Sequence, residues 1–539
     1  MTRAGWVLLV CMAACAPSRQ PTAAKAPTLE QRPREPQSLA TAPPLVWAEL
    51  DAATFARAHA EKRFLVIDGS AEWCHWCHVM ETTTYHDPDV RKVLDARFIA
   101  VKVDVDTRPD FQERYQDWGW PATVLMTPEG KEIGKYKGYL APERFIEILT
   151  AVSDAGGIET GKGQGASAGA GRSATLDAAG LASVEAMAKS QLETFWDPEQ
   201  GSWGHAQKVP LYWDNAWVLT RARAGDGEAR RRALLTLDRQ RGIVDPIWGG
   251  ICQYSTDGDW LHPHYEKLMT YEAGAIDNYA AAYALTRDAA WLRTARAVRG
   301  FVDAFLTGPD GGFYATMDAD LNAHDPGKPF VAGHEYYAKS DAERRALGIP
   351  RVDTNEYGRE NGLAISAYVT LWEASGDATV LESAKRAAAR VLSTHATDRG
   401  GITHAAGDDG RVLYLADNAA FGFALARLHE ATRDPQPLEA ARRIGDFIVR
   451  ELADPDGGFY ASTPDTNAVG VFAVRRKPFE DNVMAVRLLA RLAHLLPSDA
   501  YRSAIARALA VVGTREAIED RGRMLGDLLL ALDETRTVR

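Results

Sequence analysis

The spacing of apolar and polar residues divides this chain into two regions of different secondary structure. Between about residues 45 and 155, β-rich apolar runs such as Phe64–Asp68 and Phe98–Val105 alternate with segments of helical spacing, one of which extends to about Asp95. A strand–turn–strand pattern and a helix over Pro142–Val152 complete this region. The order predicts an α/β domain in which helices cover both faces of a mixed sheet.

The second region, about residues 176–539, consists of amphipathic helices separated by glycine-aromatic turns. The turns are G-S-W-G at 201–204, W-G-G-I at 248–251, G-G-F-Y at 311–314, G-G-I-T at 400–403 and G-G-F-Y at 457–460. An acid–asparagine pair follows each turn, at Asp214-Asn215, Asp277-Asn278, Glu360-Asn361, Asp417-Asn418 and Asp481-Asn482. Asp and Asn favour helix N-caps, so we expect these pairs to cap the helices that they open. Helix, turn and helix, repeated five times with a terminal pair at about 501–535, predict an all-α (α/α)6 toroid around a central funnel.

Two further segments lack the composition of a folded core. Residues 156–175 are mostly Gly, Ala and Ser, and residues 16–44 are rich in Pro and Ala, so we expect a flexible linker and a tether. Residues 1–15 combine Arg3, a short apolar run and small residues before Cys15, which is typical of an export signal with a lipobox. We expect lipidation of Cys15, and cleavage at another Ala without lipidation is the alternative. Either predicts export to the bacterial cell envelope, and the lipid would make the protein a periplasm-facing membrane lipoprotein.

The composition excludes one class of partner. The 539 residues are 46% hydrophobic and 25% charged, and the net charge is −11 without a basic run. Neutralising the phosphates of a nucleic acid requires a basic surface, so we expect no nucleic-acid partner. Five cysteines are too few to build a fold of this size from disulfides, and Cys252 is predicted to be a buried, unpaired thiol.

Cys74 and Cys77 form a C-x-x-C motif between a predicted strand and a predicted helix. The positive end of a helix stabilises a thiolate, and one helical turn brings the second sulfur within bridging distance. This pattern favours thiol–disulfide exchange, and a protonated His75 or His78 would favour the thiolate further. The motif is also compatible with a purely structural disulfide, with c-type haem at Cys74, Cys77 and His78, and with zinc held by the same cysteines and histidines. The flanking strand and helix disfavour haem, and four ligands within five residues disfavour zinc, so we expect no cofactor and no metal.

This first region resembles thioredoxin in three features. A-E-W-C precedes the helix, Asp68 stands six residues before Cys74, and Pro121 lies in W-P-A-T before a strand. The resemblance implies that Cys74 is an exposed nucleophile and Cys77 the resolving thiol. It also implies that Asp68 is a proton relay and that Trp120–Pro121 is a cis bond beside the substrate groove.

Aromatic and acidic side chains concentrate near the turns of the second region. We expect seven of them to face the funnel: Trp248, Tyr254, Asp257, His264, Glu266, Asp318 and Asp320. Aromatic faces and carboxylates suit sugar rings, which offer apolar CH faces and hydroxyl edges. His264 and Glu266 are the best candidates for acid–base chemistry, provided that their segment is extended, because two residues apart on a helix they would diverge.

Four motifs carry a wider resemblance: C-H-W-C-H-V-M-E, the segment 248–275, G-G-F-Y-A-T-M-D-A-D at 311–320 and R-R-K-P at 475–478. Together they resemble the spermatogenesis-associated protein 20 family, which joins a thioredoxin-like domain to a six-hairpin, glycosidase-like toroid. The toroid is also similar in fold to the N-acylglucosamine 2-epimerases. The resemblance implies this two-domain fold and no particular toroid reaction.

Three functional hypotheses follow from the sequence. The first is an exported thiol–disulfide oxidoreductase that acts on protein thiols or disulfides through Cys74 and Cys77. The second is a toroid that binds or isomerises a carbohydrate, with the first domain as an accessory. The third is a scaffold with neither activity, since a fold does not determine a function.

Overall fold

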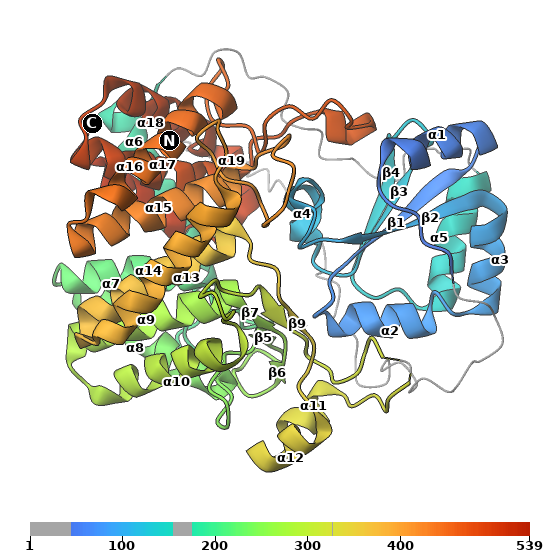
Figure 1. Cartoon of the computed structure of the whole chain (residues 1–539), viewed down its shortest axis with the longest axis horizontal. Helices are drawn as coiled ribbons and strands as arrows, with labels where there is room; N and C mark the ends of the chain where they lie inside the picture. The colour runs from blue at the N-terminus through green and yellow to red at the C-terminus, as the bar shows by residue number, and fades with distance from the viewer. Residues whose placement is uncertain (1–44, 155–174, 326, 539) are drawn as a thin grey trace, which may run out of the picture. The chain divides into compact units, whose positions relative to one another are not determined.

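The computed structural model of the chain describes residues 45–154, 175–325 and 327–538, which all belong to the same structural unit (Figure 1). The predicted signal, Cys15, the tether and all but the last residue of the predicted linker lie outside the described residues. No helix among the described residues combines the length and apolar composition needed to cross a membrane.

Over residues 45–154 the chain folds around a four-stranded sheet with the strand order β2-β1-β3-β4. β1 and β2 are parallel, whereas β3 is antiparallel to both β1 and β4, so the predicted mixed sheet is confirmed. The strands are β1 (Phe64–Ser70), β2 (Phe98–Asp104), β3 (Ala122–Met126) and β4 (Glu132–Lys137). The helices are α1 (Ala52–Glu61), α2 (His75–Thr83), α3 (Pro88–Arg97), α4 (Pro109–Tyr115), the 3-10 turn η2 (Gln116–Trp118) and α5 (Pro142–Asp154).

Apolar side chains pack on both faces of this sheet. Leu65 and Ile67 of β1 pack with residues of α1 and α4, whereas Val66 packs with residues of α2, α3 and α5. This alternation follows from the two-residue period of a strand. One prediction is wrong: the helix after the cysteines does not continue to Asp95, because Asp87 caps a new helix and Pro88 occupies its first turn.

Within the described residues, six inner helices close into a ring. Each packs against the next, and the last packs against the first. They are α7 (Tyr212–Arg223), α9 (Met269–Thr286), α13 (Gly358–Ser375), α15 (Leu415–Thr432), α17 (Phe479–Leu495) and α20 (Gly526–Thr535).

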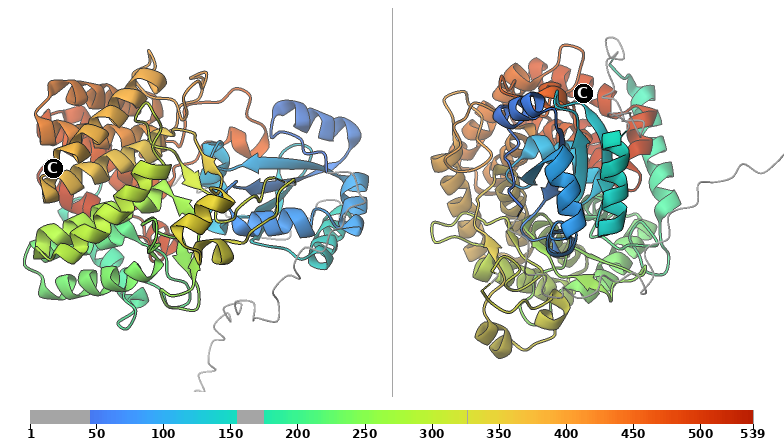
Figure 2. Two further views of the ribbon diagram at one scale, coloured as in Figure 1. Left: turned by 60° about the horizontal axis from the view of Figure 1, so that its bottom comes forward. Right: turned by 90° about the vertical axis from the view of Figure 1, so that its right-hand side faces the viewer.

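An outer layer of helices surrounds this ring, so the predicted (α/α)6 toroid is confirmed (Figure 2). The outer helices are α8 (Gly227–Gln240), α10 (Ala289–Phe305), α14 (Ala378–His395), α16 (Pro435–Phe447), α18 (Asp499–Val512) and α6 (Ala178–Phe195). Each packs against the preceding inner helix, except α6, which packs against α20 and so joins the two ends of the toroid. Shorter elements lie between them: η3 (Arg241–Ile243), β5 (Tyr254–Ser255), β6 (Pro263–His264), β7 (Lys267–Leu268), β8 (Thr316–Met317), α11 (Gly333–Tyr337), α12 (Asp341–Leu347), β9 (Val352–Asp353), η4 (Ile448–Leu452), η5 (Gly470–Ala473) and α19 (Arg515–Arg521).

The acid–asparagine pairs do not cap the helices that they open, so that prediction is wrong. They lie inside those helices, and the N-cap residues of α13, α15 and α17 make no side-chain cap hydrogen bond. Asn418 instead holds the preceding glycine-aromatic turn: its Oδ1 accepts the Ile402 N–H at 2.8 Å, and its Nδ2 donates to the Ile402 carbonyl at 3.1 Å. The same two bonds join Asn361 to Phe313 and Asn482 to Phe459.

The acids of two pairs bind a neighbouring inner helix. Asp417 of α15 accepts the Arg359 N–H at the start of α13 (2.9 Å), and Asp214 of α7 accepts the Gly526 N–H at the start of α20 (2.8 Å). The first N–H groups of a helix have no partner within it, and a carboxylate satisfies them favourably. These acids therefore cap their neighbours around the ring.

Candidate functional site

Cys74 and Cys77 lie at the start of α2, shortly after β1 ends. Cys74 is the N-cap of that helix, its Sγ accepts the Cys77 N–H at 3.2 Å, and the two sulfurs form a disulfide with the Cα atoms 5.2 Å apart. The unsatisfied N–H groups of the first helical turn favour the thiolate that reduction would create. The arrangement is therefore suited to thiol–disulfide chemistry.

The cysteine pair is buried, which corrects the expectation of an exposed nucleophile. Cys74 is 4% exposed and Cys77 is 6% exposed. Trp76, Trp120 and, from the toroid, Leu268 pack against the same apolar cluster. The resemblance to thioredoxin concerns the first domain alone, so it did not indicate that a toroid residue packs against this cluster.

Asp68 lies in β1, and Pro121 directly precedes the neighbouring strand β3. Asp68 is buried and stands opposite Thr123, and the Trp120–Pro121 peptide bond is cis, as the resemblance implied. Burial raises the pKa of Asp68 to about 7 against the opposing charge of Lys102, and no donor among the described residues reaches its Oδ1. A carboxyl that titrates near neutrality is able to accept and return a proton.

Five of the seven residues predicted to face the funnel gather instead around the cysteine motif: Tyr254, His264, Glu266, Asp318 and Asp320. Glu266 Oε1 accepts the His75 N–H at 3.4 Å, and Asp320 Oδ2 lies 2.7 Å from His75 Nδ1. The His264 ring stacks on Tyr254 with centroids 4.1 Å apart, and its centroid lies 6.5 Å from that of His75. The structure thus brings these residues together, but beside the first domain.

The electrostatics of this group follow from burial and from Asp320. Burial lowers the pKa of His264 to about 4 and raises that of Glu266 to about 7, so the order of the two pKa values is the reverse of the usual one. The segment is extended, since His264 ends β6 and Glu266 precedes β7, as the acid–base hypothesis required. Burial opposes a charge on His75, but the hydrogen bond with Asp320 and the charges of Asp320, Glu266 and Asp318 together outweigh it and raise the pKa of His75. The His75 cation next to Cys74 is thereby favoured.

The other two predicted residues are placed elsewhere. Trp248 donates from Nε1 to Asp341 Oδ1 at 2.8 Å, and the Arg344 guanidinium lies 4.8 Å from its ring centre, so Trp248 packs an outer corner of the toroid. Asp257 is exposed in the turn between β5 and β6. Cys252 is buried and free, as predicted, and Lys267 Nζ donates to its Sγ at 3.2 Å.

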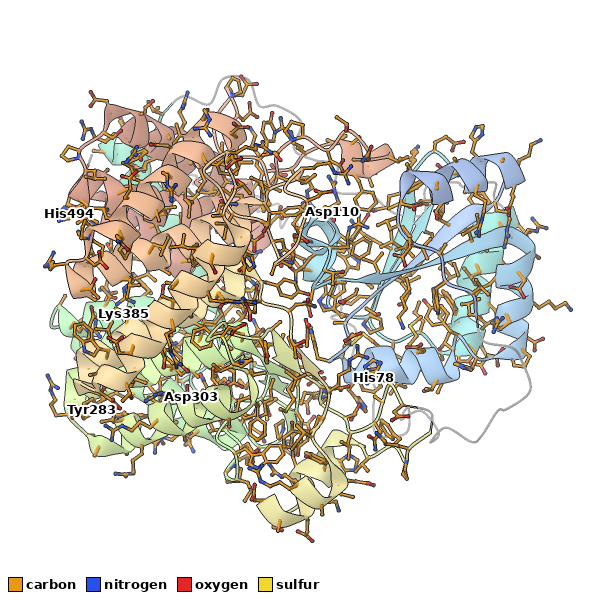
Figure 3. The ribbon with its side chains drawn as sticks, viewed as in Figure 1. His78, Asp110, Tyr283, Asp303, Lys385 and His494 are labelled. Atoms are coloured by element: carbon orange, nitrogen blue, oxygen red, sulfur yellow. A yellow bond between two sulfur atoms is a disulfide. The ribbon has the colours of Figure 1, made fainter. Side chains whose placement is uncertain are left out.

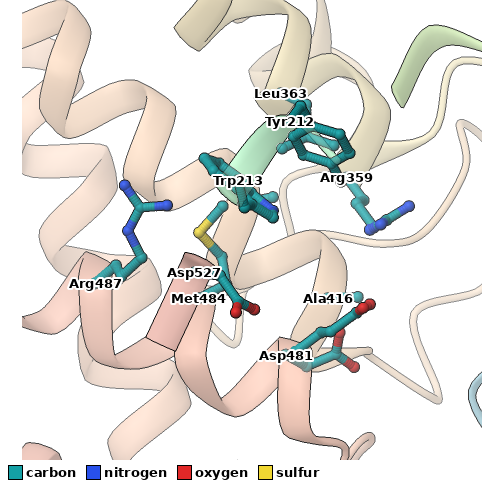
Figure 4. A pocket seen from close by; sticks show the side chains of 11 residues that line it. Tyr212, Trp213, Arg359, Leu363, Ala416, Asp481, Met484, Arg487 and Asp527 are labelled. Atoms are coloured by element: carbon teal, nitrogen blue, oxygen red, sulfur yellow. The ribbon is translucent and has the colours of Figure 1, made fainter. Parts of the chain in front are cut away.

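A separate pocket lies among the inner helices, and none of the seven predicted residues lines it (Figure 4). Its lining is Tyr212, Trp213, Arg359, Leu363, Ala416, Ala420, Glu480, Asp481, Met484, Arg487 and Asp527. Burial raises the pKa of Asp481 and of Asp527 to about 7, whereas Arg521 and Arg359 overcome burial and lower the pKa of Glu480. The acid–asparagine repeat contained the signal for this pocket, because Asp481 belongs to it and stands near the start of an inner helix.

The fold and the site define a class of protein: a thioredoxin-like domain with its cysteine motif against an (α/α)6 toroid. A protein-family model, Thioredox_DsbH, described as "Protein of unknown function, DUF255", matches residues 37–155. Spermatogenesis-associated protein 20 of Mus musculus is 26% identical over 344 residues, which cover 58% of this chain and 43% of the mouse protein. This chain is similar to the spermatogenesis-associated protein 20 family, and its match spans about two fifths of the mouse protein's length.

Two further similarities concern single domains. "Thiol:disulfide interchange protein DsbD 2" of Pseudomonas aeruginosa is 34% identical over 113 residues, or 20% of this chain and 17% of that protein. A crystal structure of D-mannose isomerase aligns with a TM-score of 0.51 at 11% identity, covering 67% of this chain and 98% of the isomerase. At that identity the second likeness establishes the toroid fold alone.

Proposed function

We propose that this chain is an exported thiol–disulfide oxidoreductase of the bacterial cell envelope, in which Cys74 and Cys77 alternate between dithiol and disulfide. The observation that carries the proposal is the Cys74–Cys77 disulfide at the N-terminus of α2. The similarity to a protein named for thiol:disulfide interchange supports it. Thiols or disulfides of other proteins would be the substrates.

Reduction of a substrate begins when the Cys74 thiolate attacks one sulfur of the substrate disulfide. A Cys74–substrate bond forms, and the other substrate sulfur leaves as a thiolate and takes a proton from solvent. Cys77 then loses its proton, for which we assign Asp68 as the acceptor, and attacks Cys74 Sγ. The second substrate thiolate leaves, and two electrons have passed from the cysteine pair to the substrate. A dithiol of lower reduction potential restores the pair, and the reverse sequence oxidises a substrate dithiol.

His75 and Asp320 would tune the first of these steps. The contact with Asp320 at 2.7 Å raises the pKa of His75 and so favours a positive charge beside the sulfur that becomes anionic. A nearby cation lowers the pKa of a thiol and stabilises the reduced state of the pair. A toroid carboxylate therefore influences the redox chemistry of the first domain.

Thiol trapping followed by mass spectrometry of the full chain tests the proposal. We expect a dithiol reductant to open the Cys74–Cys77 bond under native conditions and a small disulfide to restore it. Cys74→Ser should abolish exchange, Cys77→Ser should accumulate a mixed disulfide on Cys74, and Cys252→Ser should leave exchange unchanged. A pair that reacts with reductant only after denaturation is a structural disulfide, and the proposal is then wrong.

We also propose that the pocket among the inner helices binds a sugar or a similar polyhydroxylated ligand. Tyr212 and Trp213 supply aromatic faces, and Arg359 with Asp481 supplies charged hydrogen-bonding groups. Near neutral pH, burial keeps Asp481 partly protonated, while Glu480 next to it is ionised. A carboxyl and a carboxylate side by side can donate to and accept from sugar hydroxyls.

A glycan-binding screen of the full chain tests this second function. We expect binding that Asp481→Asn weakens and that Asp310→Asn, an exposed acid with 68% of its side chain accessible, leaves unchanged. Binding no stronger than that of an inert control protein would contradict it. Neither result depends on the state of the cysteine pair, so the two proposals fail or succeed separately.

A further inference from the structure

Two histidines and one carboxylate converge beside α2. His78 Nε2 lies 3.1 Å from His324 Nε2, and these two nitrogens lie 3.8 and 3.5 Å from Asp318 Oδ2. His78 belongs to α2 (Figure 3), whereas Asp318 and His324 belong to the toroid segment between β8 and α11. Ligand atoms from two domains thus face one point.

We propose that His78, Asp318 and His324 bind one divalent transition-metal ion, with Zn²⁺ as the first candidate. Tetrahedral zinc with ligands at its usual bond lengths separates neighbouring ligand atoms by about 3.4 Å. The three separations of 3.1, 3.5 and 3.8 Å bracket that value. Two histidines and a carboxylate with one position left over are a ligand set of zinc enzymes and of non-haem iron sites.

The fourth side of the cluster presents an oxygen. The backbone carbonyl oxygen of Glu72 lies 2.9 Å from His78 Nε2 and 2.7 Å from His324 Nε2. His324 is the most accessible member, with 25% of its side chain exposed, so water can reach this side. A carbonyl oxygen or a water molecule would complete four-coordination.

The state of Asp318 points independently to a cation. The residue is 1% exposed, and while its Oδ1 accepts the Asp320 N–H at 2.9 Å, its Oδ2 has no hydrogen-bond partner among the described residues. Leaving a buried carboxylate oxygen without a donor is costly, and a metal ion removes that cost. The unpartnered oxygen is the one that faces both histidines.

A second carboxylate holds the His78 ring in the orientation that metal binding requires. Asp320 Oδ2 lies 3.4 Å from His78 Nδ1, the ring nitrogen on the far side from the cluster. Histidine ligands in proteins commonly direct their other ring nitrogen to a carboxylate, which fixes the tautomer and leaves Nε2 free for the metal. Because Asp320 also contacts His75, the ion would be linked to the cysteine motif through one carboxylate.

This site uses neither cysteine. It differs from a zinc site within C-H-W-C-H, and it stays available while Cys74 and Cys77 are joined. Metal binding at this site would link α2 to the toroid, and it requires no redox activity. The proposal therefore stands apart from the proposed oxidoreductase function.

Metal titration of the full chain, purified without a histidine tag, tests the site. After removal of metal with a chelator and dialysis, Zn²⁺ or Co²⁺ is added, and bound metal is measured by elemental analysis and by competition with a chromophoric chelator. We expect one equivalent of metal, with Co²⁺ giving the visible absorption of a four-coordinate site. Asp318→Asn, which preserves the side-chain shape, and His324→Ala should each weaken binding at least about 100-fold.

The controls separate this site from other sources of binding. His334→Ala removes an exposed histidine of the neighbouring helix α11 and should bind like the wild type. The double variant Cys74→Ser, Cys77→Ser should also retain the metal. Lack of stoichiometric binding, unchanged binding by Asp318→Asn and His324→Ala, or loss of the metal with the cysteines would each overturn the proposal.

Discussion

His404 lies where only its protonated form satisfies its neighbours, so the stability of the protein should depend on pH through this residue. Its Nδ1 lies 3.1 Å from both carboxylate oxygens of Asp417, and its Nε2 lies 2.8 Å from the Asp106 carbonyl oxygen. Both partners are acceptors, and only the imidazolium carries a proton on each ring nitrogen. Burial opposes this charge, but Asp417 outweighs it and raises the pKa of His404 to about 9.

The size of the effect follows from the two pKa values. An unfolded histidine titrates near 6.5, and each unit of difference corresponds to about 1.4 kcal/mol, so protonated His404 contributes about 3 kcal/mol to the free energy of unfolding. The folded state binds the proton more tightly. The contribution is therefore complete below about pH 6.5 and is lost as the pH rises through about 9.

Urea denaturation of the wild type and of His404→Gln, at about pH 6 and about pH 9.5, measures this contribution. We expect the free energy of unfolding of the wild type to exceed that of the variant, and we expect this difference to be about 3 kcal/mol larger at the lower pH. His395→Gln is the matched control, because burial lowers the pKa of His395, so its contribution to stability does not decrease as the pH rises from about 6 to about 9.5. A difference between wild type and His404→Gln that is equal at both pH values would refute the reasoning.

Three further predictions concern exchange and the repeat. Asp68→Asn should slow disulfide exchange about 10²-fold and remove the rise in rate through about pH 7, measured by thiol release, whereas exposed Asp95→Asn should do neither. Exchange should be faster with a small disulfide than with a folded protein, measured by stopped-flow fluorescence, because Cys74 is 4% exposed. Asn418→Ala should lower the free energy of unfolding by about 2–4 kcal/mol in urea, because it leaves the N–H and carbonyl of Ile402 unpaired in the core.

A specific result would contradict each of these three predictions. An unchanged pH profile in Asp68→Asn would assign the proton transfer to another group. Equal rates with small and protein disulfides would show that the burial of Cys74 does not limit exchange with a folded protein. If Asn418→Ala lowers the free energy of unfolding no more than Asn467→Ala does at an exposed position, Asn418 does not stabilise the turn.

The fold was largely predictable because it depends on local periodicity. Apolar, β-rich runs predicted β1 and β2, a strand–turn–strand pattern predicted β3 and β4, and the five glycine-aromatic turns predicted the toroid. The break at Asp87 and Pro88 was missed although both residues signal a helix start, since the apolar spacing continued across it. The role of the acid–asparagine pairs was missed for another reason: Asn418 binds the turn before its own helix, and Asp417 binds the start of a different one.

The same distinction between local patterns and long-range contacts applies to the candidate site. The sequence by itself indicated the C-x-x-C motif at a helix start, the position of Asp68 and the residue types near the turns, because these depend on neighbours along the chain. Only the tertiary structure decided that Glu266, Asp318 and Asp320 face His75 and His78, and that the inner-helix pocket is lined by other residues. The physical reason is distance along the chain: the contact between His75 and Asp320 joins residues 245 positions apart. Such contacts form when two domains bury apolar surface against each other, which no local pattern records.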